Sequence, residues 1–180
     1  MAGIDDYSRR RWVGEVGSQS AIPIAKMAER LEAFRESLGH NLRFFKGDLA
    51  DYDFVLQAYR AFRPEVIVYL GEMPSAPYSM VDVHHAAYTQ TNNVIGTLNT
   101  LFAMRDTVPE CHLVKLGTMG EYGTPNVDIP EGFFEIEYRG RKDRLPFPRQ
   151  AGSFYHQAKV HDSHNTAFAS KIWSLTATDI

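Results

Sequence analysis

A continuous run of apolar residues, Val66-Ile67-Val68-Tyr69-Leu70, constrains the fold of this chain more than any other segment. Such a run ended by a glycine, here Gly71, is typical of a strand buried on both faces of a parallel sheet. Helical patterns precede it at 51–61 and follow it at 82–105. Strand and helix alternating at this spacing predict a parallel α/β sheet with helices on both faces.

The rest of the chain continues this alternation. Further helices are expected at 22–38 and 153–171, and further strands at 42–49, 112–116 and 175–180. The segment 124–150 is rich in proline, glycine and charge, and it predicts a hairpin insert whose tip is Arg139-Gly140-Arg141.

Composition and charge exclude several classes of partner. The formal net charge is −3 and no basic face is visible, so we expect no nucleic-acid partner. No apolar run approaches the ~20 residues of a membrane-spanning helix, so we expect no membrane partner. The single Cys111 cannot form an internal disulfide, which favours a reducing compartment. We therefore expect a cytoplasmic protein, or a protein of the chloroplast stroma if the chain comes from a plant or alga.

The histidines do not predict a metal site. His156, His161 and His164 share a predicted helix, but their spacings are five and three. A zinc-binding pair prefers positions i and i+4, so we expect no bound metal.

Tyr155 and Lys159 are the strongest candidates for catalysis. They lie four residues apart on the helix predicted at 153–171, so they share a face. An ammonium near a phenol lowers the tyrosine pKa from about 10, which would make Tyr155 a workable base. Such pairs also occur by chance on solvated helices. Thr118, at the end of the strand at 112–116, strengthens the interpretation because its hydroxyl can position the same substrate oxygen.

Thr118 before Tyr155-x-x-x-Lys159 in an α/β chain resembles the extended short-chain dehydrogenase/reductase superfamily. Within it, four segments resemble the UDP-sulfoquinovose synthase family: 75–80, 92–99, 112–126 and 153–165. The resemblance runs from about Asp5 to Ile180. Related dehydratases carry two adjacent acids after the threonine, whereas this chain has Met119-Gly120 and then Glu121. The resemblance implies a Rossmann-like doubly wound sheet and a partial NAD-binding domain over 1–180.

The same resemblance implies a reaction of UDP-glucose with sulfite, with NAD as cofactor. Tyr155 would take the proton of the sugar 4-hydroxyl, and Lys159 would bind the nicotinamide ribose and tune Tyr155. Hydride would pass to NAD and leave a 4-ketone, which acidifies the C5 proton. That proton and the 6-hydroxyl would then leave, sulfite would add at C6, and hydride would return to C4. Glu121 is the candidate acid–base near C5 and C6, with a surface-loop carboxylate as the alternative.

Family positions also suggest binding residues. Those on the cofactor side are Asp5, Asp6, Arg9, Asp48, Leu49 and Asn92, together with Tyr155 and Lys159. Those on the substrate side are Tyr78, Thr118, Met119 and His156. An acid at Asp5 could accept both hydroxyls of the adenosine ribose, which favours NAD over NADP.

The chain departs from the family in three places. The glycine-rich phosphate loop and the first strand before it are not found, and Gly14-Glu15-Val16-Gly17 does not replace them because it follows no strand. The C-terminal substrate region is not found either. Pro74 stands where the family often has an arginine that contacts substrate. We therefore expect a fragment, a mis-assigned gene start or a partial reading of a longer chain.

Two other functions remain open at this point. The enzyme alternative is another NAD-dependent epimerase or dehydratase of nucleotide sugars. The non-enzyme alternative is an inactive truncated remnant, or a binding or dimerisation module. The helices at 82–105 and 153–171 form the dimer contact in this superfamily, so the resemblance also implies a homodimer.

Overall fold

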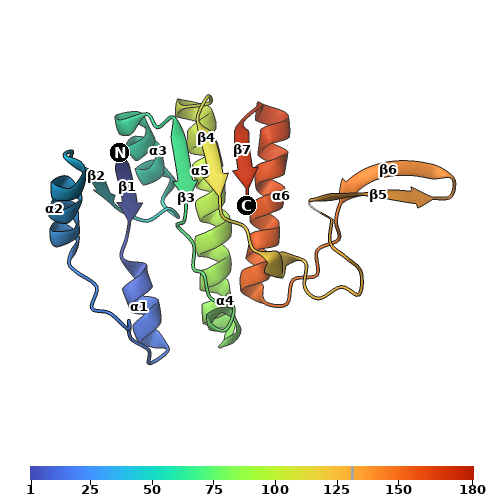
Figure 1. Ribbon diagram of the computed structural model, residues 1–180, viewed down its shortest axis with the longest axis horizontal. Coiled ribbons are helices and arrows are strands. Elements are labelled where there is room, and N and C mark those ends of the chain that lie inside the picture. The colour runs from blue at the N-terminus through green and yellow to red at the C-terminus, as the bar shows by residue number, and fades with distance from the viewer. Residues whose placement is uncertain (131) are drawn as a thin grey trace.

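The computed structural model describes residues 1–130 and 132–180 (Figure 1). The strands are β1 (Ala2–Asp5), β2 (Arg43–Lys46), β3 (Val66–Tyr69), β4 (His112–Lys115), β5 (Phe133–Tyr138), β6 (Arg141–Pro146) and β7 (Thr176–Asp179). The helices are α1 (Ser8–Glu15), α2 (Met27–Leu38), α3 (Tyr52–Phe62), α4 (Val83–Gln90), α5 (Gly96–Thr107) and α6 (Phe154–Trp173).

The parallel strands form two separate sheets. β1 pairs with β2, and β4 lies between β3 and β7 in a three-stranded sheet. In Figure 1 the arrows of β1, β3, β4 and β7 point the same way, so their carboxyl ends meet at one edge. The parallel α/β architecture predicted from the sequence is therefore confirmed.

The sheet is interrupted between β1 and β3. Within residues 1–130 and 132–180, each of these strands hydrogen-bonds to a neighbour on one side only. A cavity of about 740 Å³ is lined by both, with Ile4 and Asp5 on one side and Ile67 and Tyr69 on the other. This interruption agrees with the expectation of a Rossmann-like sheet without its first strand. In such a sheet the first strand would lie between β1 and β3 and pair with both.

The interruption changes the burial of β3. Val66 and Val68 are 56% and 59% exposed, so the expectation of a strand buried on both faces is wrong. Helices α3, α5 and α6 supply the core on one face, where Tyr69 and Leu113 are buried. The opposite face of β3 carries the exposed valines, which line the cavity between β1 and β3.

Helix α2 starts five residues later than the pattern predicts. The chain around Pro23 is irregular, and Ile24 is 47% exposed rather than on the helical face. Proline supplies no backbone donor and disfavours helical geometry before it. The helix begins after Lys26, whose backbone N–H donates to the Glu29 carboxylate at 3.1 Å.

The long helix predicted at 82–105 is divided by one π turn. Asp82 caps its start by accepting from the backbone of His84 and His85. The π turn occupies Thr91–Ile95, between α4 and α5. Such turns are frequent at functional sites, and this one places Asn92 and Asn93 beside the ends of the strands.

The segment at 124–150 contains an antiparallel hairpin of β5 and β6, which Figure 1 shows projecting away from the sheets. Its two-residue turn is Arg139-Gly140, and both residues have positive φ, 52° and 71°. Positive φ at both positions is the geometry of a tight hairpin turn, and it explains the glycine.

The pairing pattern predicts unequal protection of the strands from hydrogen exchange. Amides of β4 are bonded and covered on both edges, so peptides covering His112–Lys115 should exchange on the order of 100-fold more slowly than those covering Ala2–Asp5. Exchange mass spectrometry of the chain measures this. Equal protection of the two strands would show that the free edge of β1 is covered in solution.

Candidate active site

The start of α6 places Tyr155 and Lys159 at the carboxyl edge of the three-stranded sheet. Ser153 caps the helix, its hydroxyl accepting from the backbone N–H of His156 at 3.2 Å. The backbone N–H of Tyr155 donates to the Ser79 hydroxyl at 3.0 Å. This bond ties the first turn of α6 to the loop that follows β3.

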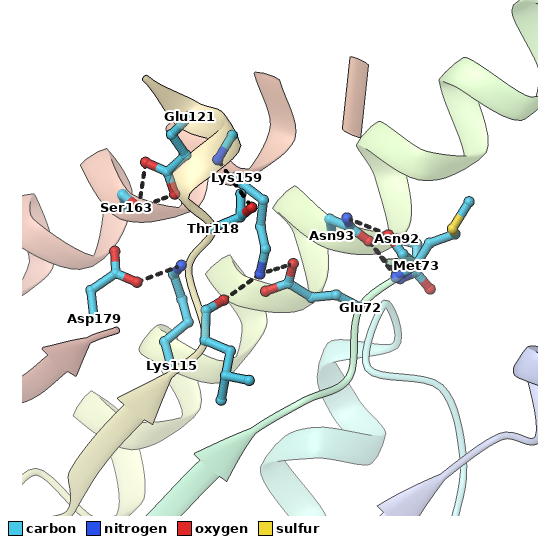
Figure 2. Close-up of polar contacts among 12 residues, drawn as sticks. Glu72, Met73, Asn92, Asn93, Lys115, Thr118, Glu121, Lys159, Ser163 and Asp179 are labelled. Carbon is cyan, nitrogen blue, oxygen red and sulfur yellow. Dashed lines mark hydrogen bonds and ion pairs between the residues drawn. The ribbon is translucent and has the colours of Figure 1, made fainter. Parts of the chain in front are cut away.

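Lys159 is buried and paired with a carboxylate. Its Nζ lies 2.5 Å from Oε2 of Glu72, and it also donates to the backbone carbonyl of Leu116 (Figure 2). Both side chains of the ion pair are 4% exposed. The ammonium therefore bridges the segment after β3 and the segment after β4.

The pKa of Tyr155 is raised above its usual value of 10. Burial is the largest cause, and the negative charges of Glu72, Glu121 and Asp162 add to it. The sequence predicts the opposite direction, from the proximity of Lys159. The difference has a physical reason, because the Lys159 ammonium is offset by the Glu72 carboxylate at 2.5 Å.

Thr118 begins a single 3₁₀ turn, Met119–Glu121, directly after β4. Its hydroxyl accepts from the backbone N–H of Gly120 at 3.2 Å, so the side chain helps to form the turn. Met119 is 87% exposed. A Cβ at position 120 would overlap the imidazole of His156. A side chain at position 120 would therefore require the His156 imidazole to move.

Glu121 points into the protein rather than to solvent. It is 3% exposed, accepts from Ser163 Oγ at 3.0 Å and pairs with Arg149 Nε at 3.2 Å. Burial raises its pKa, while the charge of Arg149 and the Ser163 bond oppose the rise. The alternative of a surface-loop carboxylate is wrong, since Glu121 is held by α6 and by the segment after the hairpin.

Six of the eight predicted cofactor residues, from three separate segments, line one cavity, the cavity between β1 and β3. They are Asp5, Asp6, Arg9, Asp48, Leu49 and Asn92, whereas Tyr155 and Lys159 lie outside its lining. Gly71, Glu72 and Pro74 line the same cavity, which places it beside Lys159. Asp5 ends β1 and is exposed, with Oδ1 accepting from Tyr7 N at 2.6 Å. A carboxylate there has acceptor capacity left for ribose hydroxyls, so these residues fit the adenosine end of a dinucleotide.

The predicted substrate residues are not all gathered at one place. His156 lies against Gly120 and its ring centroid is 5.1 Å from that of Tyr155. Tyr78 is buried away from them, and its hydroxyl donates to Glu15 of α1 at 2.6 Å. Burial and that carboxylate raise the pKa of Tyr78 to about 12. Its hydroxyl is therefore engaged within the protein.

Sequence reasoning missed Asn93, which holds the loop after β3. Its Oδ1 accepts from Met73 N at 2.8 Å and its Nδ2 donates to Met73 O at 3.2 Å (Figure 2). Asn92, the predicted neighbour, donates to Asn93 Oδ1 at 2.9 Å. Helical periodicity could not identify Asn93, because the π turn that directs it inward has no signal in the pattern.

Glu72 follows Gly71 at the end of β3, and its pairing with Lys159 has no signal in the sequence pattern. Asp162, on α6, was missed entirely because it lies among residues expected to be ordinary helix. It is fully buried, and burial raises its pKa to about 8.

Among residues 1–130 and 132–180 no group of three His, Cys, Asp or Glu side chains could hold a metal ion. None of the helices in this part of the chain is both long and apolar enough to span a membrane.

Comparison with known proteins gives relatives along the whole chain. The family described as GDP-mannose 4,6 dehydratase matches residues 13–165. The chloroplastic UDP-sulfoquinovose synthase of Spinacia oleracea is 50% identical over 177 residues, which cover 98% of this chain and 37% of that protein. The UDP-sulfoquinovose synthase of Sulfolobus acidocaldarius is 44% identical over 181 residues, covering 100% of this chain and 46% of that protein. The chain thus spans less than half the length of these curated relatives.

Solved structures share the fold at low sequence identity. The UDP-Glc/GlcNAc 4-epimerase of Campylobacter jejuni superposes with a TM-score of 0.70 at 16% identity, covering 99% of this chain and 44% of that one. The UDP-glucose 4-epimerase of Brucella ovis, solved in complex with NAD, gives a TM-score of 0.61 at 20% identity, with 80% and 39% coverage. At these identities the structures support the fold alone.

The Asn93 clamp predicts a specific loss of stability. Asn93→Ala would leave the buried N–H and C=O of Met73 without partners, so the free energy of unfolding should fall by about 2–3 kcal/mol. Urea denaturation measures this. The matched control is Asn92→Ala, which leaves both Met73 bonds in place and should cost about 1 kcal/mol or less. Equal losses in the two variants would contradict a role specific to Asn93.

Proposed function

Because the chain belongs to the GDP-mannose 4,6 dehydratase family, we propose that it carries the acid–base residues of a UDP-sulfoquinovose synthase. The reaction would convert UDP-glucose and sulfite to UDP-sulfoquinovose. One observation carries the proposal: the turn of Thr118, Met119, Gly120 and Glu121 packs on α6 through the contact of Gly120 with His156. With the imidazole in place, position 120 has no room for the second acid of the related dehydratases. The curated relatives of this name, 50% and 44% identical, support the same activity.

Each polar group of the turn and of α6 then has a task. Tyr155 accepts the proton of the sugar 4-hydroxyl, and Thr118 orients that hydroxyl with its own. Glu121, kept away from water by burial, exchanges protons near C5 and C6. A raised pKa suits this work, because it makes the carboxylate a better proton acceptor than an exposed glutamate.

NAD is the proposed cofactor, and when bound it accepts and returns a hydride at the sugar. The adenosine end would lie in the cavity between β1 and β3, against Asp5, Asp6, Arg9, Asp48 and Leu49. Asn92 and Lys159 would face the nicotinamide end. Residues 1–180 would act as a partial NAD-binding domain, with the hairpin segment at 124–150 as an insert.

The proposed oligomer is a homodimer through 82–105 and 153–171. Apolar side chains exposed on these helices support it: Ile95 at 39%, Phe168 at 62% and Ile172 at 47%. The chloroplastic relative of spinach supports the stroma as the proposed compartment in a plant or alga. The cytoplasm remains the proposal for other organisms.

Incubating the chain with UDP-glucose, millimolar NAD and sulfite tests the activity, with UDP-sulfoquinovose detected by mass. Tyr155→Phe should lower the rate at least ~100-fold, the usual contribution of a positioned acid–base group. Glu121→Gln should lower it similarly. Normal turnover by Glu121→Gln would remove that residue from the mechanism.

Controls without sulfite separate the alternatives. A 4-keto or C4-epimerised product formed without sulfite would identify another epimerase or dehydratase. No turnover by the wild-type chain at millimolar NAD would favour the non-catalytic alternative.

We also expect this 180-residue chain to bind NAD weakly. A glycine-rich turn that presents backbone N–H groups to the pyrophosphate is not found in the sequence, and the cavity walls of β1 and β3 are not joined by a strand. Isothermal titration calorimetry should give a dissociation constant for NAD of about 1 mM or weaker. A parallel titration with AMP measures binding at the adenosine end alone. Tight NAD binding would refute this expectation.

A further inference from the structure

The ion pair between Glu72 and Lys159 joins two segments that are far apart in the sequence. Glu72 lies just after β3 and Lys159 lies in the second turn of α6, and Figure 2 shows their side chains pointing at each other. Each is 4% exposed, and their charged atoms are 2.5 Å apart. A buried pair at this distance is strongly coupled, because removal of one charge leaves the other without compensation.

The backbone holds the Glu72 carboxylate in place from both directions. Glu72 N–H donates to the carbonyl of Leu70 at 2.9 Å, in a tight turn directly after the strand. The next residue, Met73, is fixed by the two bonds from Asn93 in the π turn. The carboxylate is therefore aimed at Lys159 by the fold and not by a flexible loop.

Other charges nearby have different partners or positions. Lys115 on β4 pairs with Asp179 of β7 at 3.0 Å, so its charge is already offset. Asp162 lies one turn further along α6 than Lys159; burial and the charge of Glu72 raise its pKa, and the charges of Lys115 and Lys159 oppose the rise. Glu121 is paired with Arg149. Only Glu72 makes an ion pair with Lys159 within residues 1–130 and 132–180.

We propose that Glu72 is a positioning residue. Its carboxylate anchors the Lys159 ammonium beside the Leu116 carbonyl, and it offsets the Lys159 charge at the Tyr155 hydroxyl. The proposal rests on the roles of Tyr155 and Lys159 in the proposed function. While the pair is intact, the Lys159 charge is offset and Tyr155 is a weaker acid than an unpaired Lys159 would make it. When the charge of Glu72 is neutralised, the Lys159 charge acts on Tyr155 and favours the phenolate.

The groups that face Tyr155 agree with this arrangement. The charges that raise its pKa, after burial itself, are Glu72 first, then Glu121 and Asp162. His156 packs its ring 5.1 Å from that of Tyr155. Lys159 is the cation on the same helix face, and its ammonium is turned to Glu72 and Leu116.

A titration of Tyr155 in the 180-residue chain tests the proposal without nucleotide, sugar or sulfite. Tyrosine labelled with ¹³C at Cζ reports each phenol by NMR, and Tyr155→Phe assigns the Tyr155 signal. Glu72→Gln keeps the shape of the side chain and removes its charge, so the pKa of Tyr155 should fall by about one pH unit or more. The matched control is Glu15→Gln, a carboxylate bonded to Tyr78, which should leave the pKa of Tyr155 unchanged.

A second variant separates charge from structure. Glu72→Gln combined with Lys159→Met removes both charges, so the pKa of Tyr155 should return close to the wild-type value. A merely structural role of Glu72 predicts no such return. If Glu72→Gln does not fold, the double variant is compared with Lys159→Met alone, in which the unopposed Glu72 should give the higher Tyr155 pKa.

Two results would overturn the proposal: an unchanged Tyr155 pKa in folded Glu72→Gln, or the same fall in the single and double variants. In the fallback comparison, equal values in Lys159→Met and the double variant would overturn it. None of these results depends on sulfosugar formation. Failure of the proposed reaction therefore leaves the role of Glu72 standing, and failure of this test leaves the reaction standing.

Discussion

The buried ion pair between Lys159 and Glu72 is the contact on which the geometry of the site depends. It connects α6 to the ends of β3 and β4, since the ammonium also bonds the Leu116 carbonyl. A lysine buried in this way needs a partner, because an isolated ammonium away from water is costly. By pairing with Lys159, Glu72 fixes the first turns of α6 relative to the sheet. The same contact therefore fixes the positions of Tyr155 and His156.

The interrupted sheet imposes a second constraint, on the cofactor side. β4 is paired on both edges and packs on the main core, so Thr118 and Glu121 follow a strand that is hydrogen-bonded on both sides. The residues of the proposed adenosine side stand on β1 and β2, which form a separate sheet. The residues after β4 and those of the proposed adenosine side therefore belong to different sheets, and Glu72, which lines the cavity and pairs with Lys159, connects the two.

The sequence was sufficient for the order of strands and helices, because apolar runs and caps are local signals. Asp51 capping α3 and Ser153 capping α6 are examples. It was not sufficient for burial: Val66 and Val68 have the composition of a two-sided core strand, yet their exposure is decided by which elements pack on them. The resemblance identified Tyr155 and Lys159, but the direction of the Tyr155 pKa depends on Glu72, a contact between residues 87 positions apart that no periodicity encodes.

The contact between Gly120 and His156 connects sequence differences within the family to chemistry. An acid at position 120 would need the space that the imidazole fills, so the two positions are coupled and a change at one requires a change at the other. Met119, 87% exposed, cannot replace the missing acid, since a thioether neither gives nor takes a proton at neutral pH. Glu121 is the acidic residue of this turn, and its buried contacts with Ser163 and Arg149 set its position and oppose the rise in its pKa that burial causes.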